Sequence, residues 1–400
     1  MKTSIAIIGS GPSALMLASM LDTKRFEVTI YERNMAPARK FLVAGDGGLN
    51  LTHSEEVDEL VPRYTPSSFM ERYIRHFDNQ ALRAWFAGIG IETWVGSSRR
   101  VFPRQGTKPA KVLKAMVDHT LEREVKWQFQ HTFTGWDAQG NLLMNNTAQD
   151  IIVKSDIVVF ALGGASWPVT GSAGEWRNMF LDKGISVPAF AASNCAYRVD
   201  WSKEASKKLA GHFLKNIVVH TGLKSMAGEL VITKEGLEGG AIYALSSELR
   251  AALLKNGKAS IKIDLKPSFS LEKVIEILSY PGKKTDQLKK YVRLSETQLA
   301  MIKLLVSKDD FMDTGRLAAL IKAFPLEIIG AAPIDEAIST VGGVSLDEVD
   351  EHLQLKKLPN TYCMGEMLDW DAPTGGYLLQ AAFSMGAYLA DHLNKHELSR

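Results

Sequence analysis

The start of the chain combines the spacings of a strand, a helix and a second strand. Residues 5–8 form a short apolar, β-branched run that ends in glycine, which is typical of a buried parallel strand. A second such run covers residues 27–31. Between them, apolar residues recur at helical spacing at Ala14, Leu17, Ala18 and Leu21. The pattern predicts a βαβ unit of about thirty residues.

The periodicity of the remaining chain changes after residue 190. Before that point it predicts a loop at 35–52, helices at 69–90 and 109–123, and strands at 125–133 and 157–160. After it, short strands are expected at 197–201, 217–221, 229–233 and 260–265, and helices over 271–324. A strand at 361–364 and a long helix at 376–394 follow.

We therefore predict an α/β fold built on a discontinuous Rossmann-like domain. Residues 1–190 and 335–400 are expected to form this domain together. A β-rich, barrel-like domain at 191–266 and a small helical domain at 267–334 are expected as insertions.

The composition is that of a globular protein, and it limits the kinds of partner that the protein can have. Lys+Arg 47 against Asp+Glu 45 leaves a formal charge of +2, which argues against a dedicated nucleic-acid binder. Cys195 and Cys363 lie far apart with no CxxC motif, so no disulfide framework is indicated. No apolar run approaches the ~20 residues that a bilayer requires, and Gly9 to Ser13 interrupt any signal-like stretch. We expect a cytoplasmic protein that acts on a small molecule, with no membrane or nucleic-acid partner and with its oligomeric state open.

A dinucleotide-binding motif lies between the first strand and the first helix. Gly9 permits a tight turn, Gly11 lets the main chain approach a pyrophosphate, and Ala14 allows close helix packing. Glu32 ends the next strand, where a carboxylate accepts hydrogen bonds from ribose hydroxyls. A carboxylate at this position disfavours a 2′-phosphate, so the motif predicts FAD or NAD rather than NADP.

Several further segments carry a resemblance to a known family. The motifs are IAIIGSGPSA, RKFLVAGDGGLNLTH, RVFP, ALGGASWPVTGS, GELVITKEG, STVGGV and GEMLDWDAPTGGYLLQAA. Their order from residue 5 to about 390 resembles the HI0933-like flavoproteins, also called BaiN-like NAD(P)/FAD-dependent oxidoreductases. The resemblance implies FAD held in a two-dinucleotide-binding-type domain that a β-rich and a helical domain interrupt.

The resemblance also assigns cofactor-binding residues. It places the pyrophosphate on Gly9, Gly11 and Ala14, the ribose on Glu32, the adenine at the main chain of Val125, and the isoalloxazine beside Lys40, Gly47, Gly48 and Asn50. Ala161 to Gly163, including Leu162, would close over the cofactor, Glu366 would lie near the ribityl chain, and Gly375, Gly376 and Tyr377 would direct N–H groups at the flavin N1–C2=O edge. The binding set also includes Pro12, Ser13, Arg33, Gly365 and Leu378, the last standing where many relatives carry Asn.

The motifs do not identify a catalytic residue. Three residues are weak catalytic candidates, and each has a structural interpretation as well. Lys40 is a solvated loop lysine or a residue at the cofactor edge, and His53 is a structural histidine or an acid/base. Tyr377 is a packing residue at a helix start or a proton donor. His392 and His396 have the i, i+4 spacing of metal ligands but lack the rest of a metal motif, so we predict a solvated helix end and no metal.

We predict an FAD-dependent oxidoreductase that transfers hydride between NAD(P)H, or another donor, and a small organic substrate such as a conjugated enone. No second GxGxxG motif is present, so NAD(P)H would dock transiently. Two other functions share the FAD motif, namely a folate-dependent tRNA-modifying flavoprotein and a non-catalytic FAD-binding module.

Overall fold

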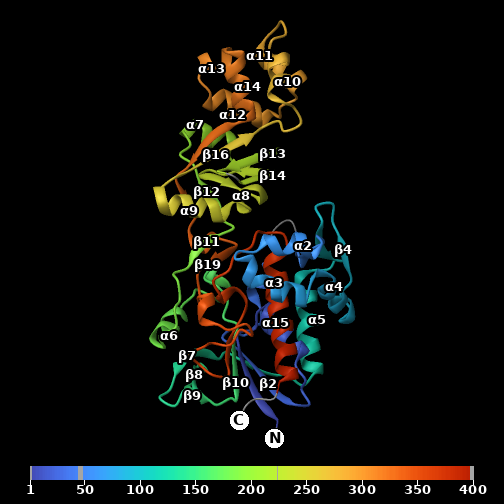
Figure 1. The fold of residues 1–400 in the computed structure, drawn as a ribbon, viewed down its shortest axis with the longest axis vertical. Coiled ribbons are helices and arrows are strands. Elements are labelled where there is room, and N and C mark those ends of the chain that lie inside the picture. The colour runs from blue at the N-terminus through green and yellow to red at the C-terminus, as the bar shows by residue number, and fades with distance from the viewer. Residues whose placement is uncertain (1, 44–47, 223, 397–400) are drawn as a thin grey trace. The chain divides into compact units, whose positions relative to one another are not determined.

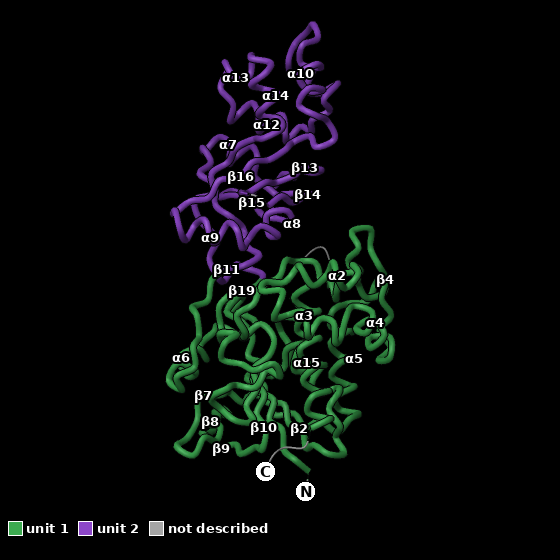
Figure 2. The backbone as a smooth tube through the Cα atoms, in the orientation of Figure 1, with its two compact units in different colours: residues 1–191, 339–400 green, residues 192–338 purple. Residues whose placement is uncertain are grey.

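The computed structural model describes residues 2–43, 48–222 and 224–396, and these form two compact units (Figure 2). The first unit comprises residues 1–191 and 339–400, and the second comprises residues 192–338. The segments expected as a β-rich and a helical domain thus fall in one unit, and their finer division stays a prediction.

A parallel sheet forms the centre of the first unit. Its strands are, in spatial order, β20 (Thr361–Cys363), β10 (Ile157–Phe160), β1 (Thr3–Ile8), β2 (Phe26–Glu32) and β6 (Lys126–Phe129). The strand from the C-terminal segment pairs with β10, so both ends of the chain build one sheet. This confirms the predicted α/β Rossmann-like fold.

Helices and small antiparallel sheets surround this centre. The helices are α1 (Pro12–Met20), α2 (Val57–Leu60), α3 (Ser67–His76), α4 (Asn79–Gly88), α5 (Pro109–Glu122), α6 (Arg177–Asp182) and α15 (Tyr377–Lys395), with 3₁₀ turns η1 (Arg39–Leu42), η2 (Val61–Arg63), η3 (Pro168–Thr170), η6 (Leu346–Glu348) and η7 (Gly365–Met367). One antiparallel sheet has the order β3 (Thr52–His53), β5 (Arg100–Pro103) and β4 (Thr93–Val95), and another has β7 (Thr132–Trp136), β8 (Leu142–Asn145) and β9 (Asp150–Val153). The short strands β11 (Ala191–Ser193) and β19 (Ser339–Val341) lie where the units connect.

The C-terminal helix α15 packs on the N-terminal helix α1 and on α3, and Figure 1 shows α3 beside α15. The crossing is close because Gly386 has no side chain, and a Cβ added there would lie 2.4 Å from the carbonyl oxygen of Ser13. Leu17 of α1 and Leu389 of α15 are fully buried in the same core. Packing therefore fixes the position of the α1 N-terminus on the sheet.

The predicted elements agree with this unit except at their boundaries. The helix expected over 69–90 is two helices, because Asp78 caps a new helix through the N–H groups of Gln80 and Ala81. The strand expected over 125–133 is also broken, since Gln130 adopts a left-handed conformation (φ 59°) between β6 and β7.

The second unit combines an antiparallel sheet with helices. In spatial order the strands are β17 (Phe324–Ile328), β16 (Ala259–Asp264), β13 (Phe213–Thr221), β14 (Lys224–Ile232), β15 (Gly236–Glu238), β12 (Tyr197–Arg198) and β18 (Gly330–Ala331). The helices are α7 (Lys203–Leu209), α8 (Gly240–Tyr243), α9 (Ser246–Asn256), α10 (Leu271–Leu278), α11 (Lys284–Gln287), α12 (Glu296–Leu305), α13 (Lys308–Met312) and α14 (Thr314–Lys322), with a π-helical turn η4 (Leu288–Val292) and a 3₁₀ turn η5 (Ile334–Glu336). One apolar core joins Ile261 and Ile263 of the sheet to Val274 and Leu317 of the helices. Within the described residues, no helix combines the length and the apolar content needed to cross a bilayer.

Candidate functional site

The turn between β1 and α1 has the geometry of a phosphate-binding site. Gly9 has φ +100°, and an added Cβ would lie 2.4 Å from the carbonyl oxygen of Ala161, so only glycine is free of strain there. The first main-chain bond within α1 runs from Leu15 N to Gly11 O (3.0 Å). The preceding N–H groups of Ser13 and Ala14 therefore have no helical acceptor, and they lie at the positive end of the helix dipole. A Cβ added at Gly11 would meet no atom within 4 Å, which leaves room for a ligand.

Glu32 ends β2 beside this turn, buried at 7% exposure. One carboxylate oxygen accepts a hydrogen bond from Ser10 Oγ, and the other accepts from the main-chain N–H and the side-chain amide of Asn34, both at 2.8 Å. A carboxylate has about four acceptor positions, so Glu32 retains capacity for a hydroxyl donor. The neighbouring Arg33 forms an exposed ion pair with Glu175 (2.9 Å).

The structure does not bring Val125 to this site. Val125 precedes β6, whose first residue Lys126 is in register with Thr29. The parallel register instead places Phe129 beside Glu32, and His131 N donates to Glu32 O (2.9 Å). At ~3.3 Å per residue, Val125 lies about 13 Å along the strand from that end. Val125 therefore lies at the opposite end of the strand from the Glu32–Phe129 pair, and the adenine contact expected there stays a prediction.

Two predicted segments close around the Gly9 turn. Ala161 N donates to Ile8 O (2.9 Å), which brings the end of β10 and the following Leu162 and Gly163 to the turn. A Cβ added at Gly365 would lie 2.7 Å from Ser13 Oγ, so η7 lies against the start of α1.

Lys40 and Glu366 form an ion pair at the edge of this region. The Lys40 ammonium lies 2.9 Å and 3.0 Å from the two carboxylate oxygens and donates to Ser166 Oγ at 2.6 Å. Both side chains are only partly exposed, at 34% and 23%. The pair joins the loop after β2 to η7, two segments that the sequence analysis assigned separately to the cofactor.

The N-terminus of α15 faces the loop that contains Asn50. A Cβ added at Gly376 would lie 2.5 Å from the main-chain carbon of Thr52, so the two segments are in direct contact. The first bond within α15 runs from Gln380 N to Gly376 O (2.9 Å), which leaves the N–H groups of Tyr377 and Leu378 without helical acceptors. The Leu378 side chain packs on the apolar core.

The loop before β3 contributes a buried polar atom. Among the described residues, the buried Oδ1 of Asn50 has no hydrogen-bond partner. An unpaired buried acceptor is costly, and a ligand donor is one way to satisfy it. Gly48 lies near the Phe102 ring, with a hypothetical Cβ–ring distance of 3.6 Å. The predicted residue Gly47 lies outside the described residues.

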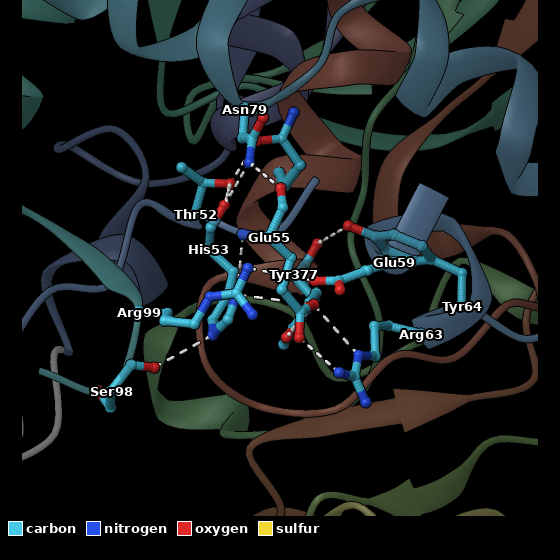
Figure 3. A network of polar contacts seen from close by, with 11 residues as sticks. Thr52, His53, Glu55, Glu59, Arg63, Tyr64, Asn79, Ser98, Arg99 and Tyr377 are labelled. Carbon is cyan, nitrogen blue, oxygen red and sulfur yellow. Dashed lines mark hydrogen bonds and ion pairs between the residues drawn. The ribbon is translucent and has the colours of Figure 1, made fainter. Parts of the chain in front are cut away.

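Glu55 is the centre of a buried polar network that the sequence motifs did not indicate (Figure 3). Its carboxylate, 5% exposed, accepts hydrogen bonds from the Arg63 guanidinium and from Tyr377 Oη, the latter at 2.9 Å. Burial raises the pKa of Glu55, but the bonds from Arg63 and Tyr377 outweigh it, so the pKa is below its ordinary value. Burial and the Glu55 hydrogen bond raise the pKa of the Tyr377 phenol. Tyr377 thus keeps its proton at neutral pH.

His53 lies in the same network with both ring nitrogens engaged. Its Nδ1 accepts from the main-chain N–H of Glu55 (3.3 Å), which assigns the proton to Nε2, 3.2 Å from the carbonyl oxygen of Ser98. The ring stacks on Tyr377 at 5.2 Å between centroids, and burial lowers its pKa. This geometry favours the structural interpretation of His53.

His392 and His396 are joined by a third histidine. The ring of His352 lies 3.9 Å from that of His392, and His392 lies 4.6 Å from His396. His396 is exposed, as expected of a solvated helix end, whereas His352 and His392 are partly buried in the stack. Within the described residues, no group of three or more His, Cys, Asp or Glu is placed to hold a metal ion.

The first unit's site fits the cofactor that its sequence implies. The uncovered N–H groups of α1 suit a pyrophosphate, Glu32 suits a ribose, and the unpaired oxygen of Asn50 suits a donor on a flavin ring. The turn before α1 and Glu32 also lie at the carboxyl ends of β1 and β2, the edge where open α/β sheets bind ligands.

A model of the HI0933-like protein Rossmann domain matches residues 3–392. The chain belongs to this family. Among curated relatives, the 3-dehydro-bile acid delta(4,6)-reductase of Clostridium scindens is 23% identical over 412 residues, covering 96% of this chain and 97% of the relative. The ribosomal RNA dihydrouridine synthase of Haemophilus influenzae is 22% identical over 410 residues, covering 94% and 95%. A synthase of the same name from Escherichia coli is 20% identical over 404 residues, covering 94% of each chain.

Solved structures of flavoenzymes share the fold of this chain. The 3-ketosteroid delta1-dehydrogenase of Sterolibacterium denitrificans aligns with a TM-score of 0.53 at 13% identity, covering 98% of this chain and all of that one. A flavocytochrome c3 fumarate reductase aligns at 0.52 and 13% identity, covering 98% and 78%. Two of these relatives are named as enzymes that act on ribosomal RNA, so the comparisons do not support the expectation that this chain has no nucleic-acid partner.

Proposed function

We propose that this protein is an FAD-dependent reductase that saturates a carbon–carbon double bond conjugated to a carbonyl group. The observation that carries the proposal is the α1 N-terminus, with space in front of Gly11 and Glu32 at the adjoining strand end. This arrangement is suited to the pyrophosphate and ribose of a dinucleotide cofactor.

The names of the relatives support the reaction class. A delta(4,6) double-bond system in a 3-dehydro bile acid is conjugated to the 3-oxo group. The uracil double bond that is saturated in dihydrouridine is conjugated to a ring carbonyl. Hydride addition to the carbon distant from the carbonyl, followed by protonation of the nearer carbon, describes both reductions.

The chain's own residues bind, orient and supply a proton. Hydride transfer is the chemistry that FAD contributes when bound. Gly9 to Ala14 and Glu32 would hold the dinucleotide, and the N–H groups at the start of α15 would favour negative charge beside them.

Tyr377 is the residue that we propose as proton source. Its phenol remains protonated at neutral pH, and its hydroxyl proton is donated to Glu55, so proton transfer to a substrate requires the hydroxyl to turn away from Glu55. The Glu55 carboxylate, itself held by Arg63, fixes the orientation of the Tyr377 hydroxyl.

A small conjugated carbonyl compound is the substrate class that we propose, with NADH or NADPH as electron donor. The near-neutral charge of the chain favours a small molecule over a polyanion. Uridine in RNA is the second candidate substrate, because two relatives are named as ribosomal RNA dihydrouridine synthases.

The test follows the visible spectrum of the purified protein. We expect a yellow protein that NADH or NADPH bleaches without oxygen, and that cyclohex-2-enone or a 3-oxo-4-ene steroid reoxidises. Protein that stays colourless after incubation with FAD would contradict the cofactor assignment. Bleaching reversed by uridine-containing RNA but by neither enone would favour the second substrate, and absence of bleaching would favour a non-catalytic module.

A further inference from the structure

The β4–β5 hairpin exposes an aromatic pair on one face. Trp94 and Phe102 are opposite each other in the register, and their rings stack at 5.5 Å with an interplanar angle of 25°. Trp94, which has the larger ring of the two, is 46% exposed. Side chains alternate along a strand, so Arg100 lies on the same face as Phe102, while Val101 and Pro103 are buried on the other. Phe102 is partly buried, so the pair presents mainly the Trp94 ring, and an exposed apolar patch bordered by polar residues is typical of a binding surface.

Arg100 is the unpaired cation of this hairpin. Arg99 pairs with Glu59 at 3.2 Å and Arg104 pairs with Glu92 at 3.1 Å. Among the described residues, the Arg100 guanidinium has no hydrogen-bond or ion-pair partner, although its side chain is partly buried. A partly desolvated guanidinium with free N–H groups is a ready donor for a ligand oxygen.

The same face borders the segments assigned to the cofactor. A Cβ added at Gly48 would lie 3.6 Å from the Phe102 ring, and one added at Gly375 would lie 3.4 Å from Arg100 Nε. Gly96, next to the turn, leaves the ring uncovered, since a Cβ there would approach Phe102 to 3.0 Å. The aromatic pair and the cation thus adjoin both the Asn50 loop and the start of α15.

We infer that this hairpin face is the substrate-binding wall, on which Trp94 and Phe102 pack against a flat conjugated ring while Arg100 donates hydrogen bonds to its carbonyl oxygen. The inference rests on the proposed function and specifies its substrate as a planar cyclic compound. One unpaired cation suits one oxygen, whereas a dinucleotide or an RNA presents several phosphates.

The position of Arg100 has a chemical consequence. If FAD supplies the hydride, as the proposed function requires, a new C–H bond would form at the distant carbon and the π-electron pair of the double bond would move toward the carbonyl oxygen. Protonation at the nearer carbon then forms the second C–H bond and restores the carbonyl. A guanidinium at the oxygen stabilises the negative charge that develops between these steps.

A planar oxyanion tests the inference without knowledge of the natural substrate. The probe is 4-hydroxybenzaldehyde, whose phenolate oxygen would occupy the carbonyl position and whose ring, packed beside a flavin, gives a long-wavelength absorption band. We expect the FAD-loaded protein to bind it and Arg100→Gln to weaken the affinity by about tenfold or more, since a charge-assisted hydrogen bond is lost. Trp94→Leu should weaken it less. Arg104→Gln is the matched control from the same hairpin and should leave the affinity unchanged.

The outcomes separate this inference from the proposed function. Unchanged probe affinity in Arg100→Gln, or no binding to the unmodified FAD-loaded protein, would overturn the inference even if enones are reduced. A shifted flavin reduction potential with unchanged probe affinity would also overturn it, by assigning Arg100 to the cofactor. If Arg100→Gln fails to fold, Arg100→Lys provides the measurement, with weaker binding expected because the lysine has no planar donor pair. Probe binding without reduction of any conjugated carbonyl would refute the proposed function instead.

Discussion

Glu55→Ala should lower the free energy of unfolding of the first unit by about 3 kcal/mol. The substitution removes the acceptor for Tyr377 Oη, and this hydroxyl belongs to a side chain that is only 6% exposed. A buried donor left unpaired costs ~1–3 kcal/mol. The Arg63 ion pair adds less, about 0.5–1 kcal/mol, because the Arg63 side chain is 40% exposed and solvent screens it.

A double-mutant cycle measures the part of this loss that depends on Tyr377. Urea unfolding of the wild type, Glu55→Ala, Tyr377→Phe and the double variant should show a coupling of about 1 kcal/mol or more, because Tyr377→Phe already removes the group that Glu55→Ala leaves unpaired. Additive losses within ~0.5 kcal/mol would refute the described network. The pKa of Glu55 is below its ordinary value, so its stabilisation is present above that ordinary value and is lost as the pH falls through the native one. The difference in free energy of unfolding between the wild type and Glu55→Ala should therefore become smaller at acidic pH.

Three further predictions concern other parts of the first unit. Gly9→Ala should lower both the thermal unfolding temperature and the FAD content read from the absorbance ratio, with a cost of ~2 kcal/mol or more, because φ is +100° and the new Cβ would lie 2.4 Å from Ala161 O; an unchanged melting curve would contradict this. Glu32→Ala should weaken FAD binding by about tenfold or more through the lost ribose contact, measured by flavin fluorescence during dissociation, whereas Glu175→Ala, at an exposed ion pair, serves as the control. Burial, His352 and His396 lower the pKa of His392 to about 4. The free energy of unfolding should therefore fall by about 1 kcal/mol, after allowance for solvent screening, as the pH drops from 6.5 toward 4. The fall should be smaller in His392→Gln, and equal pH profiles of the two proteins would disprove the lowered pKa of His392.

The Rossmann-like part of the fold could be predicted because its signals are local. Residues 5–8 and 157–160 are continuous apolar runs, and the structure places β1 and β10 there. The apolar spacing located the helix α15, but the helix is buried on more than one side, because Phe383 and Leu393 belong to different apolar clusters. Each of these elements carries its own pattern of burial, which does not depend on distant residues.

The candidate site was predictable only where main-chain geometry matters. Gly9 and Gly376 have positive φ, a conformation that favours glycine, so a glycine in the sequence can indicate it. Glu55 lies in no motif, and its partners Arg63 and Tyr377 come from distant segments. No local signal could have identified that network.

The remaining differences have tertiary causes. Residues 125–133 look like one strand, whereas a left-handed Gln130 splits them into β6 and β7, and the parallel register places Phe129 beside Glu32. The β4–β5 hairpin lacks the continuous β-branched pattern of a core strand, because Trp94 and Arg100 face outward. His352 became part of a histidine stack only through the fold.

The packing of α1 on α15 also determines when the protein can mature during translation. Helix α1 emerges early, but its partner at 377–395 is added roughly 350 residues later, which takes roughly 20–70 s at ribosomal speeds. During that interval the nascent βαβ segment has an uncovered apolar flank that a chaperone would shield. The proposed FAD would therefore bind only at the end of synthesis.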